Sequence, residues 1–143
     1  MTRCLWTLAL IGSSASAQDS SDSFQPVATT RQLMLDMIHP ASNDILLFIY
    51  RGAPKDDTEW AALRRSALAL AESGNLLMMR GRVRDQGEWM KNAKMLIDVG
   101  NAVYKAAQAK DAKALAALAE PLDASCTACH KQYRPNVFPV QGK

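Results

Sequence analysis

Cys126-Thr127-Ala128-Cys129-His130, close to the C-terminal end, is the stretch that decides how this chain is interpreted. On an α-helix of about 3.6 residues per turn, Cys129 lies about 60° around the axis from Cys126, and His130 lies about 40° from it. The two thiols and the imidazole therefore share one helix face. C-x-x-C-H is typical of covalent haem attachment. The motif predicts one haem c, bound through two thioethers at Cys126 and Cys129, with His130 as the proximal iron ligand.

The motif has three alternative interpretations. A structural zinc site usually has four protein ligands, and His39 is the only other histidine in the chain. A thioredoxin-like C-x-x-C lies near a βαβ pattern, and the sequence has no strand pattern. A local disulfide between the two cysteines is the third alternative, in an oxidising compartment. Haem attachment is the favoured interpretation, given the secretory pattern of the first residues.

The first residues have the pattern of a secretory signal. Arg3 is followed by an apolar run at residues 4–11, and Ala15-Ser16-Ala17 fits an A-x-A cleavage site. The run is too short to cross a bilayer as a helix. We expect cleavage after this site, which leaves residues 18–143 as a periplasmic protein without a membrane span. Cys4 leaves with the signal, so both remaining cysteines belong to the haem motif.

The charge of the expected mature chain is small. Removing the signal takes away Arg3 alone among the charged residues, so the net charge of +3 becomes +2. No dense basic patch with interleaved aromatic residues is present, and we expect no nucleic-acid partner. The basic residues at 80–84 are predicted to form a solvated loop, with docking of an acidic redox partner as the alternative. Residues 18–28 are predicted to be a flexible leader, and 29–143 a single domain.

Four helical stretches follow the leader, at about 29–50, 58–79, 85–110 and 111–134. Pro40 predicts a kink or short break in the first stretch, and Pro121 predicts a bend or break in the last. Asp111 is a candidate N-cap, and Gly100 is predicted to allow close packing against a neighbouring helix or the haem. Four helices with short connections predict an all-α, antiparallel four-helix bundle, with the haem attached near the C-terminus of the last helix.

Apolar residues recur at helical spacing in each stretch and are the predicted core. In the first stretch they are Met34, Met37, Ile38, Ala41, Ile45, Phe48 and Ile49. In the second and third they are Trp60, Leu63, Ala67, Leu70, Gly74 and Leu77, then Trp89, Ala93, Leu96, Gly100, Val103 and Ala107. In the last, the same face carries Leu115, Leu118, Leu122, the haem motif and Tyr133.

At this point the chain resembles the class II cytochromes c, which comprise cytochrome c′ and its low-spin relatives. The resemblance rests on the C-terminal motif in its extended form, Cys126-x-x-Cys129-His130-x-x-Tyr133-Arg134, and on the short turn Ala109-Lys110-Asp111. It rests also on the opening of the first helix, Arg31-Gln32-Leu33-Met34-Leu35. The two prolines inside helices and the pair Met78-Met79 depart from the family's pattern. Family members are often dimers that use the first two helices, so a homodimer is one implied partner.

In the family that the chain resembles, the group at the sixth iron position decides between gas binding and electron transfer. In cytochrome c′ an apolar side chain blocks it, and the high-spin haem binds small gases such as NO and CO; Leu35 is the candidate blocker here. In the low-spin relatives a methionine of the first helix fills it, and His/Met ligation favours electron transfer. Met34 is the favoured distal ligand, ahead of Met37 and Met78. A methionine at helical spacing is nevertheless most often core filler.

The resulting expectation is a periplasmic monohaem cytochrome that carries single electrons between donor and acceptor proteins. The alternative is a gas-binding cytochrome with an open sixth position. Arg31 and Arg134 are candidate partners of the haem propionates, and Tyr133 is expected at the haem edge. His39 is expected at the surface. No arrangement of acid and base side chains for catalysis is present, so we do not expect an enzyme.

Overall fold

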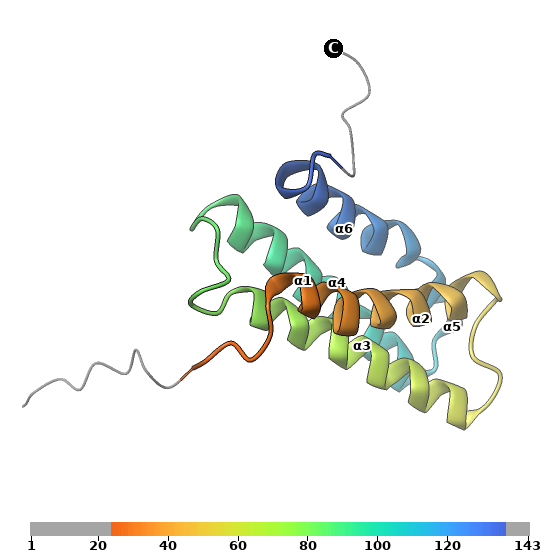
Figure 1. Cartoon of the computed structure of the whole chain (residues 1–143). Helices are drawn as coiled ribbons and strands as arrows, with labels where there is room; N and C mark the ends of the chain where they lie inside the picture. Colours follow the sequence, from red (N-terminus) through yellow and green to blue (C-terminus); the bar gives the residue numbers. More distant parts are fainter. Residues whose placement is uncertain (1–23, 137–143) are drawn as a thin grey trace, which may run out of the picture.

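The computed structural model describes residues 24–136 (Figure 1). The predicted signal peptide, residues 1–17, and the first part of the predicted leader lie outside this range. All regular elements of residues 24–136 are helical, and they pack as a four-helix bundle, which confirms the predicted fold class. The elements are α1 (Thr30–Leu33), η2 (Met34–Ile38), α2 (His39–Tyr50), α3 (Asp57–Leu77), α4 (Glu88–Ala109), α5 (Ala112–Ala116) and α6 (Ala119–Tyr133).

Helices α3 and α4 form the most extensive pair in the bundle. Every residue of their two predicted seams is buried. Gly100 of α4 lies so close to α3 that a Cβ there would be 2.7 Å from the backbone nitrogen of Ala71. Gly74 of α3 lies equally close to α4, because a Cβ there would be 2.9 Å from the carbonyl oxygen of Ala93. Gly100 therefore serves the contact between helices, which was one of its two predicted roles.

The first helix is continuous from α1 through α2, but η2 is a π-helical turn. The backbone N–H of His39 bonds to the carbonyl of Met34, five residues earlier. Pro40 follows directly and has no N–H for a regular bond to Asp36. The predicted irregularity thus lies where Pro40 indicated, as a π turn and not as a break.

The π turn changes which residues face the core. Leu33 and Ile38, five residues apart, are both buried at 2% and 5% exposure. A turn that holds one extra residue carries Met37 out of the predicted seam, and its side chain is 40% exposed. The prediction of Met37 as a core residue was therefore wrong, while the later seam residues of α2 are buried or half-buried.

The last predicted stretch is broken into α5 and α6, as Pro121 indicated. Pro121 lies in the first turn of α6, where the N–H that it lacks would have no intrahelical partner. Asp111 caps α5 by accepting a hydrogen bond from the backbone of Ala114 at 2.9 Å. Helix α6 packs chiefly against α4, and it carries the haem motif on its last turns.

Arg82 ties the loop between α3 and α4 to the start of the described chain. Its side chain is buried, and its guanidinium donates to the carbonyl oxygens of Ala28 at 2.9 Å and Leu76 at 3.1 Å. This contact holds the residues just before α1 against the end of α3. Among residues 24–136, no helix is both long and apolar enough to span a bilayer.

Candidate haem site

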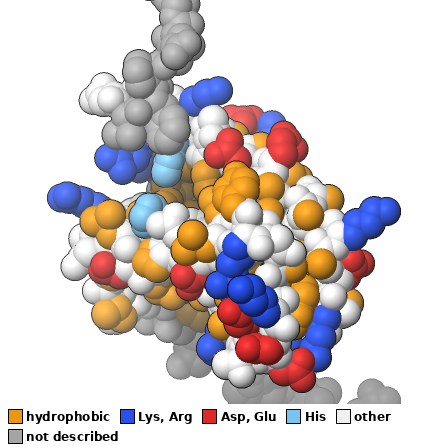
Figure 2. Space-filling view, turned by 90° about the vertical axis from the view of Figure 1, so that its right-hand side faces the viewer, with side chains coloured by type: hydrophobic (Ala, Val, Ile, Leu, Met, Phe, Trp, Pro, Cys, Tyr) orange, Lys and Arg blue, Asp and Glu red, His pale blue; other side chains and the backbone are white. Residues whose placement is uncertain are grey.

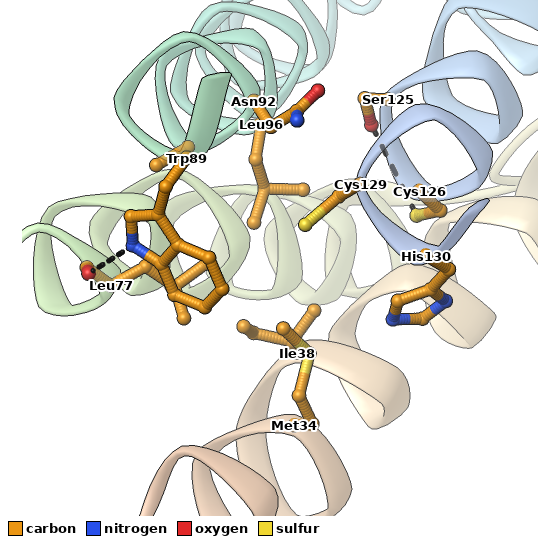
Figure 3. A pocket seen from close by; sticks show the side chains of 11 residues that line it. Met34, Ile38, Leu77, Trp89, Asn92, Leu96, Ser125, Cys126, Cys129 and His130 are labelled. Carbon is orange, nitrogen blue, oxygen red and sulfur yellow. Dashed lines mark hydrogen bonds between the residues drawn. The ribbon is translucent and has the colours of Figure 1, made fainter. Parts of the chain in front are cut away.

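Two adjoining cavities lie where α6 faces α4 and the first helix. The inner cavity is small, about 40 Å³, and reaches between α4 and α6. The outer cavity is about 430 Å³ and opens beside the start of α1, the loop before α4 and the end of α6. Four side chains line both: Met34, Trp89, Cys129 and His130. The two cavities are therefore parts of one site, and Figure 3 shows its inner part.

The haem motif faces this site as its helical spacing predicted. Cys126, Cys129 and His130 all line the inner cavity, and the last two also line the outer one. Both cysteines are half-buried free thiols, so the alternative of a local disulfide is not what the structure has. Ser125, beside the motif, donates its hydroxyl to the carbonyl of Leu122 at 2.8 Å and lies 4.0 Å from the sulfur of Cys126.

Burial sets the ionisation of all three motif side chains. It raises the pKa of Cys126, which the Ser125 hydroxyl partly offsets, and it also raises the pKa of Cys129. Burial lowers the pKa of His130, and the charge of Arg134 lowers it further. A neutral imidazole keeps the ring lone pair that binds a metal ion. The protein environment thus favours the form of His130 that an iron ligand needs.

Of the three methionines predicted as distal ligands, the structure brings Met34 into the site. Met34 lines both cavities from the side opposite α6, and Figure 3 shows its side chain rising beside Ile38 while His130 comes from α6. Met37 instead lines a separate cavity beside Arg82. Met78 packs against the core at the end of α3 and lines neither cavity of the site. His39 is exposed and lies outside both cavities, as expected.

Three arginines line the outer cavity. Arg31 and Arg134 were predicted there, and Arg84 joins them from the loop before α4. The guanidinium of Arg84 lies 6.0 Å from the centre of the Trp89 ring. In Figure 2, exposed histidine atoms (pale blue) lie next to apolar side chains, and Lys and Arg side chains lie nearby on the same face. The sequence indicated a basic cluster at residues 80–84, but it did not show which of these arginines would face the site.

Tyr133 closes one end of the site, as its position in the motif predicted. Its hydroxyl donates to a carboxylate oxygen of Asp85, and its ring meets Trp89 edge-on with centroids 5.0 Å apart. The other oxygen of Asp85 accepts from the backbone N–H groups of Gly87 at 2.9 Å and Trp89 at 3.0 Å. Burial and the hydrogen bond to Asp85 raise the pKa of Tyr133 to about 12. Asp85 therefore joins the end of α6 to the start of α4.

The donor set and the cavity fit a covalently bound haem. Two thiols and a neutral imidazole line one wall, a thioether lies across the cavity, and guanidinium groups line its outer part. The outer cavity of about 430 Å³ is within the range of about 300–1,000 Å³ that is typical of ligand and cofactor sites. Cys126 and Cys129 would hold the porphyrin, His130 would ligate the iron, and the arginines would pair with the carboxylates at the haem edge.

Fold and site together define a helical bundle that carries a covalent haem motif on its last helix, which is the construction of a c-type haem protein. The family model of cytochrome C' matches residues 83–134, from the loop before α4 to the end of the haem motif. Over α4, α5 and α6 the chain is thus similar to cytochrome C', in agreement with the resemblance to the class II cytochromes c. The match does not include α1, η2, α2 or α3. Searches among curated proteins and among solved structures found no match.

Proposed function

We propose that this protein is a periplasmic one-electron carrier whose single haem c is ligated by His130 and Met34. The observation that carries the proposal is the place of Met34, across the cavity from the haem motif and in both parts of the site. A methionine in that position can close the sixth coordination site against exogenous ligands. Bound haem supplies an iron that accepts and returns one electron, and His/Met ligation raises its potential.

The side chains around the site support this role. Ile38, Leu77 and Leu96 line the inner cavity with apolar groups. These groups would exclude water from a bound haem iron and would limit the charge reorganisation that accompanies electron transfer. Arg31, Arg84 and Arg134 would neutralise the haem carboxylates. The proposed partners are donor and acceptor redox proteins of the same compartment. The periplasmic location rests on the signal-like residues 1–17.

The proposal is tested by replacing Met34 in the haem-loaded protein and recording optical spectra. The Met34→Ala protein should change from low-spin to high-spin and should bind carbon monoxide when reduced, because the sixth position would lose its ligand. Met37→Ala is the matched control, since Met37 belongs to the same π turn but lines neither part of the site. Its spectrum should equal that of the wild type. An unchanged low-spin spectrum in Met34→Ala would exclude Met34 as the ligand.

Gas binding is the second candidate, and one observation favours it. Leu35, beside Met34, also lines the outer cavity although its side chain is 55% exposed. If Leu35 and not Met34 covers the iron, the sixth position is open to NO and CO. A wild-type protein that is high-spin and binds carbon monoxide would support this candidate, and Leu35→Ala would then increase the rate of carbon monoxide binding.

A further inference from the structure

Arg82 is the one charged side chain that is buried among residues 24–136, at 7% exposure. In that range no carboxylate forms an ion pair with it. Its Nε atom is also the one buried side-chain nitrogen or oxygen there that has no hydrogen-bond partner. Burying a charged group without a counter-charge is costly. This cost has to be offset by what the other atoms of the guanidinium hold together.

The guanidinium joins the segment before the first helix to the end of α3. One of its terminal nitrogens donates to the carbonyl oxygen of Ala28 at 2.9 Å, across 54 residues of sequence. The other donates to the carbonyl oxygen of Leu76 at 3.1 Å and lies 3.3 Å from the sulfur of Met79. One side chain thus holds two separate backbone segments at a fixed separation.

Hydrogen bonds extend this contact from Ala28 along α1 to Met34. Thr29 follows Ala28 and caps the helix, because its hydroxyl accepts from the backbone N–H of Gln32 at 3.2 Å. The Gln32 side chain in turn accepts from the backbone N–H of Thr29 at 3.0 Å. The backbone N–H of Met34 bonds back to carbonyl groups of the same short helix. The chain from Ala28 to Met34 is therefore held as one unit.

The other end of the link belongs to the wall of the haem site. Leu77 follows Leu76 and lines the inner cavity. Its carbonyl oxygen accepts the indole N–H of Trp89 at 2.9 Å (Figure 3). Trp89 lines both the inner and the outer cavity. Arg82 therefore connects the segment that carries Met34 to the wall that faces it.

We propose that Arg82 is a positioning residue that holds Met34 where it can coordinate the haem iron. This inference rests on the proposed function and adds to it a residue that lines neither cavity of the site. Helix α1 has few contacts with the other helices beyond the buried Leu33, so the bond to Ala28 restricts its movement. Without this bond, Met34 would leave the iron more often and the sixth position would open.

The affinity of the oxidised, haem-loaded protein for cyanide tests this role. Cyanide competes with Met34 for the sixth position, so a weaker bond from Met34 to iron raises the apparent affinity. We expect Arg82→Met to raise it about tenfold, at the low end of the effect of removing a residue that orients a metal ligand. An affinity equal to that of the wild type would overturn the proposal.

Arg80→Met is the matched control for this measurement. Arg80 lies in the same loop and is exposed, and it lines neither cavity of the site. Its replacement removes the same charge and introduces the same side chain. The cyanide affinity of Arg80→Met should therefore equal that of the wild type. A rise as large as that of Arg82→Met would show an effect of charge and would contradict positioning by the buried guanidinium.

A Met34→Ala background shows whether Arg82 acts through Met34. In that background the sixth position has already lost its ligand, so adding Arg82→Met should leave the cyanide affinity unchanged. A rise of the same size as in the protein with Met34 would mean that the variant loosens the whole cavity. That result would contradict the positioning role.

Thr29→Ala carries the test if Arg82→Met does not fold. Thr29 is exposed, and its replacement breaks the cap that couples Ala28 to α1. The cyanide affinity should again rise, and an unchanged affinity in the folded variant would overturn the route through α1. Failure of the proposed function is recognised separately. A wild-type protein with the cyanide affinity of Met34→Ala would have no bond from Met34 to iron, whereas equal affinities of Arg82→Met and a closed wild type would overturn this inference alone.

Discussion

Glycine residues determine how closely helices α3 and α4 approach each other. At Gly100 a Cβ would lie 2.7 Å and 2.9 Å from the backbone N and Cα of Ala71. Backbone atoms within a paired helix cannot rotate away as a flexible side chain would. The seam of α4 also carries Trp89, which lines the haem site, so this close approach helps to position one wall of the cavity.

Gly100→Ala should therefore destabilise the protein, although alanine favours helix more than glycine does. The overpacking cost is about 1–3 kcal/mol, which outweighs the gain of about 1 kcal/mol in helix propensity. The free energy of unfolding from chemical denaturation measures the difference. Asn101→Ala is the control, because Asn101 is exposed on the same helix and its replacement changes helix propensity without adding bulk to the contact with α3. A stabilised Gly100→Ala protein would contradict the observed helix approach.

At Tyr133, one hydrogen bond links the haem helix to the loop before α4. The pKa of Tyr133 is about 12 in the folded protein, raised by burial and by the bond to Asp85, against an ordinary value of 10.0. A group whose pKa is raised on folding stabilises the fold below its unfolded pKa. That stability is lost as the pH rises through the folded value. The contribution of Tyr133 is thus complete below about pH 10 and disappears towards pH 12.

Asp85→Asn should lower the pKa of Tyr133, because it removes both the carboxylate acceptor and its negative charge. Burial would still hold the pKa above its ordinary value. Ultraviolet difference titration of tyrosine ionisation measures this shift directly. The comparison is Asp98→Asn on α4, whose partner is Lys94 at the helix surface, and it should leave the titration of Tyr133 unchanged. Coincident titration curves for Asp85→Asn and the wild type would refute the link.

At the level of the element, the π turn decides which methionine enters the site. One extra residue between Leu33 and Ile38 keeps both in the core and turns Met37 outwards. Pro40 lowers the cost of this irregularity. Even in a regular α-helix, Pro40 has no N–H to donate to the carbonyl of Asp36, so the π turn loses no bond there. Burial of Leu33 and Ile38 stabilises the protein by about 1.5–3 kcal/mol each, which exceeds the net value of about 0.5–1.5 kcal/mol for one hydrogen bond. Packing is therefore the stronger of the two causes.

Deleting the exposed Asp36 should consequently be tolerated. The π turn would become an ordinary α-helical turn, and Leu33 and Ile38 would stay on one face because their spacing would fall from five to four. Deleting the exposed Asn43 from the regular helix α2 is the matched control. It would rotate Met34 by about 100° relative to Ile45. Thermal unfolding and the haem spectrum should be near wild type in the first protein and strongly altered in the second; equal damage in both would contradict this view.

Most of the site residues that could be predicted from the sequence lie in local motifs. Cys126, Cys129 and His130 could be assigned because they lie within little more than one helical turn, where the backbone alone sets their relation. Met34 was favoured over Met37 from the sequence, but helical spacing placed both on the core face. The outward turn of Met37 could not be predicted, because the π turn depends on packing of the first helix against the bundle. The burial of Asn92 on α4 gave no signal, since one polar residue beside Ala93 in an amphipathic helix looks like a solvated position. Asp85 was missed because its partner is 48 residues away.

On the scale of the whole molecule, the helices differ in how much protein packing supports them. Helices α3 and α4 pair closely along their length, whereas α6 contacts mainly α4 and borders the cavities on its other side. The haem would fill that space and attach to α6 through two covalent bonds. We therefore expect the stability of α6 to depend on the cofactor more than that of the central pair.

Hydrogen exchange of a haem-free Cys126→Ala/Cys129→Ala protein tests this division. Backbone amides of α6 should exchange faster than in the haem-loaded protein, because few buried contacts hold that helix alone. Amides in the middle of α3 and α4 should keep most of their protection. A uniform rise in exchange along all helices would instead mean that the cofactor supports the bundle as one cooperative unit.

The central claim is that a haem held by Cys126, Cys129 and His130 is closed on its other side by Met34. The most direct measurement is the optical spectrum of the purified protein, oxidised, reduced, and reduced under carbon monoxide. We predict low-spin spectra, a weak far-red band of iron–sulfur ligation in the oxidised form, and no response to carbon monoxide. A high-spin spectrum that shifts with carbon monoxide would contradict the claim and assign the protein to gas binding.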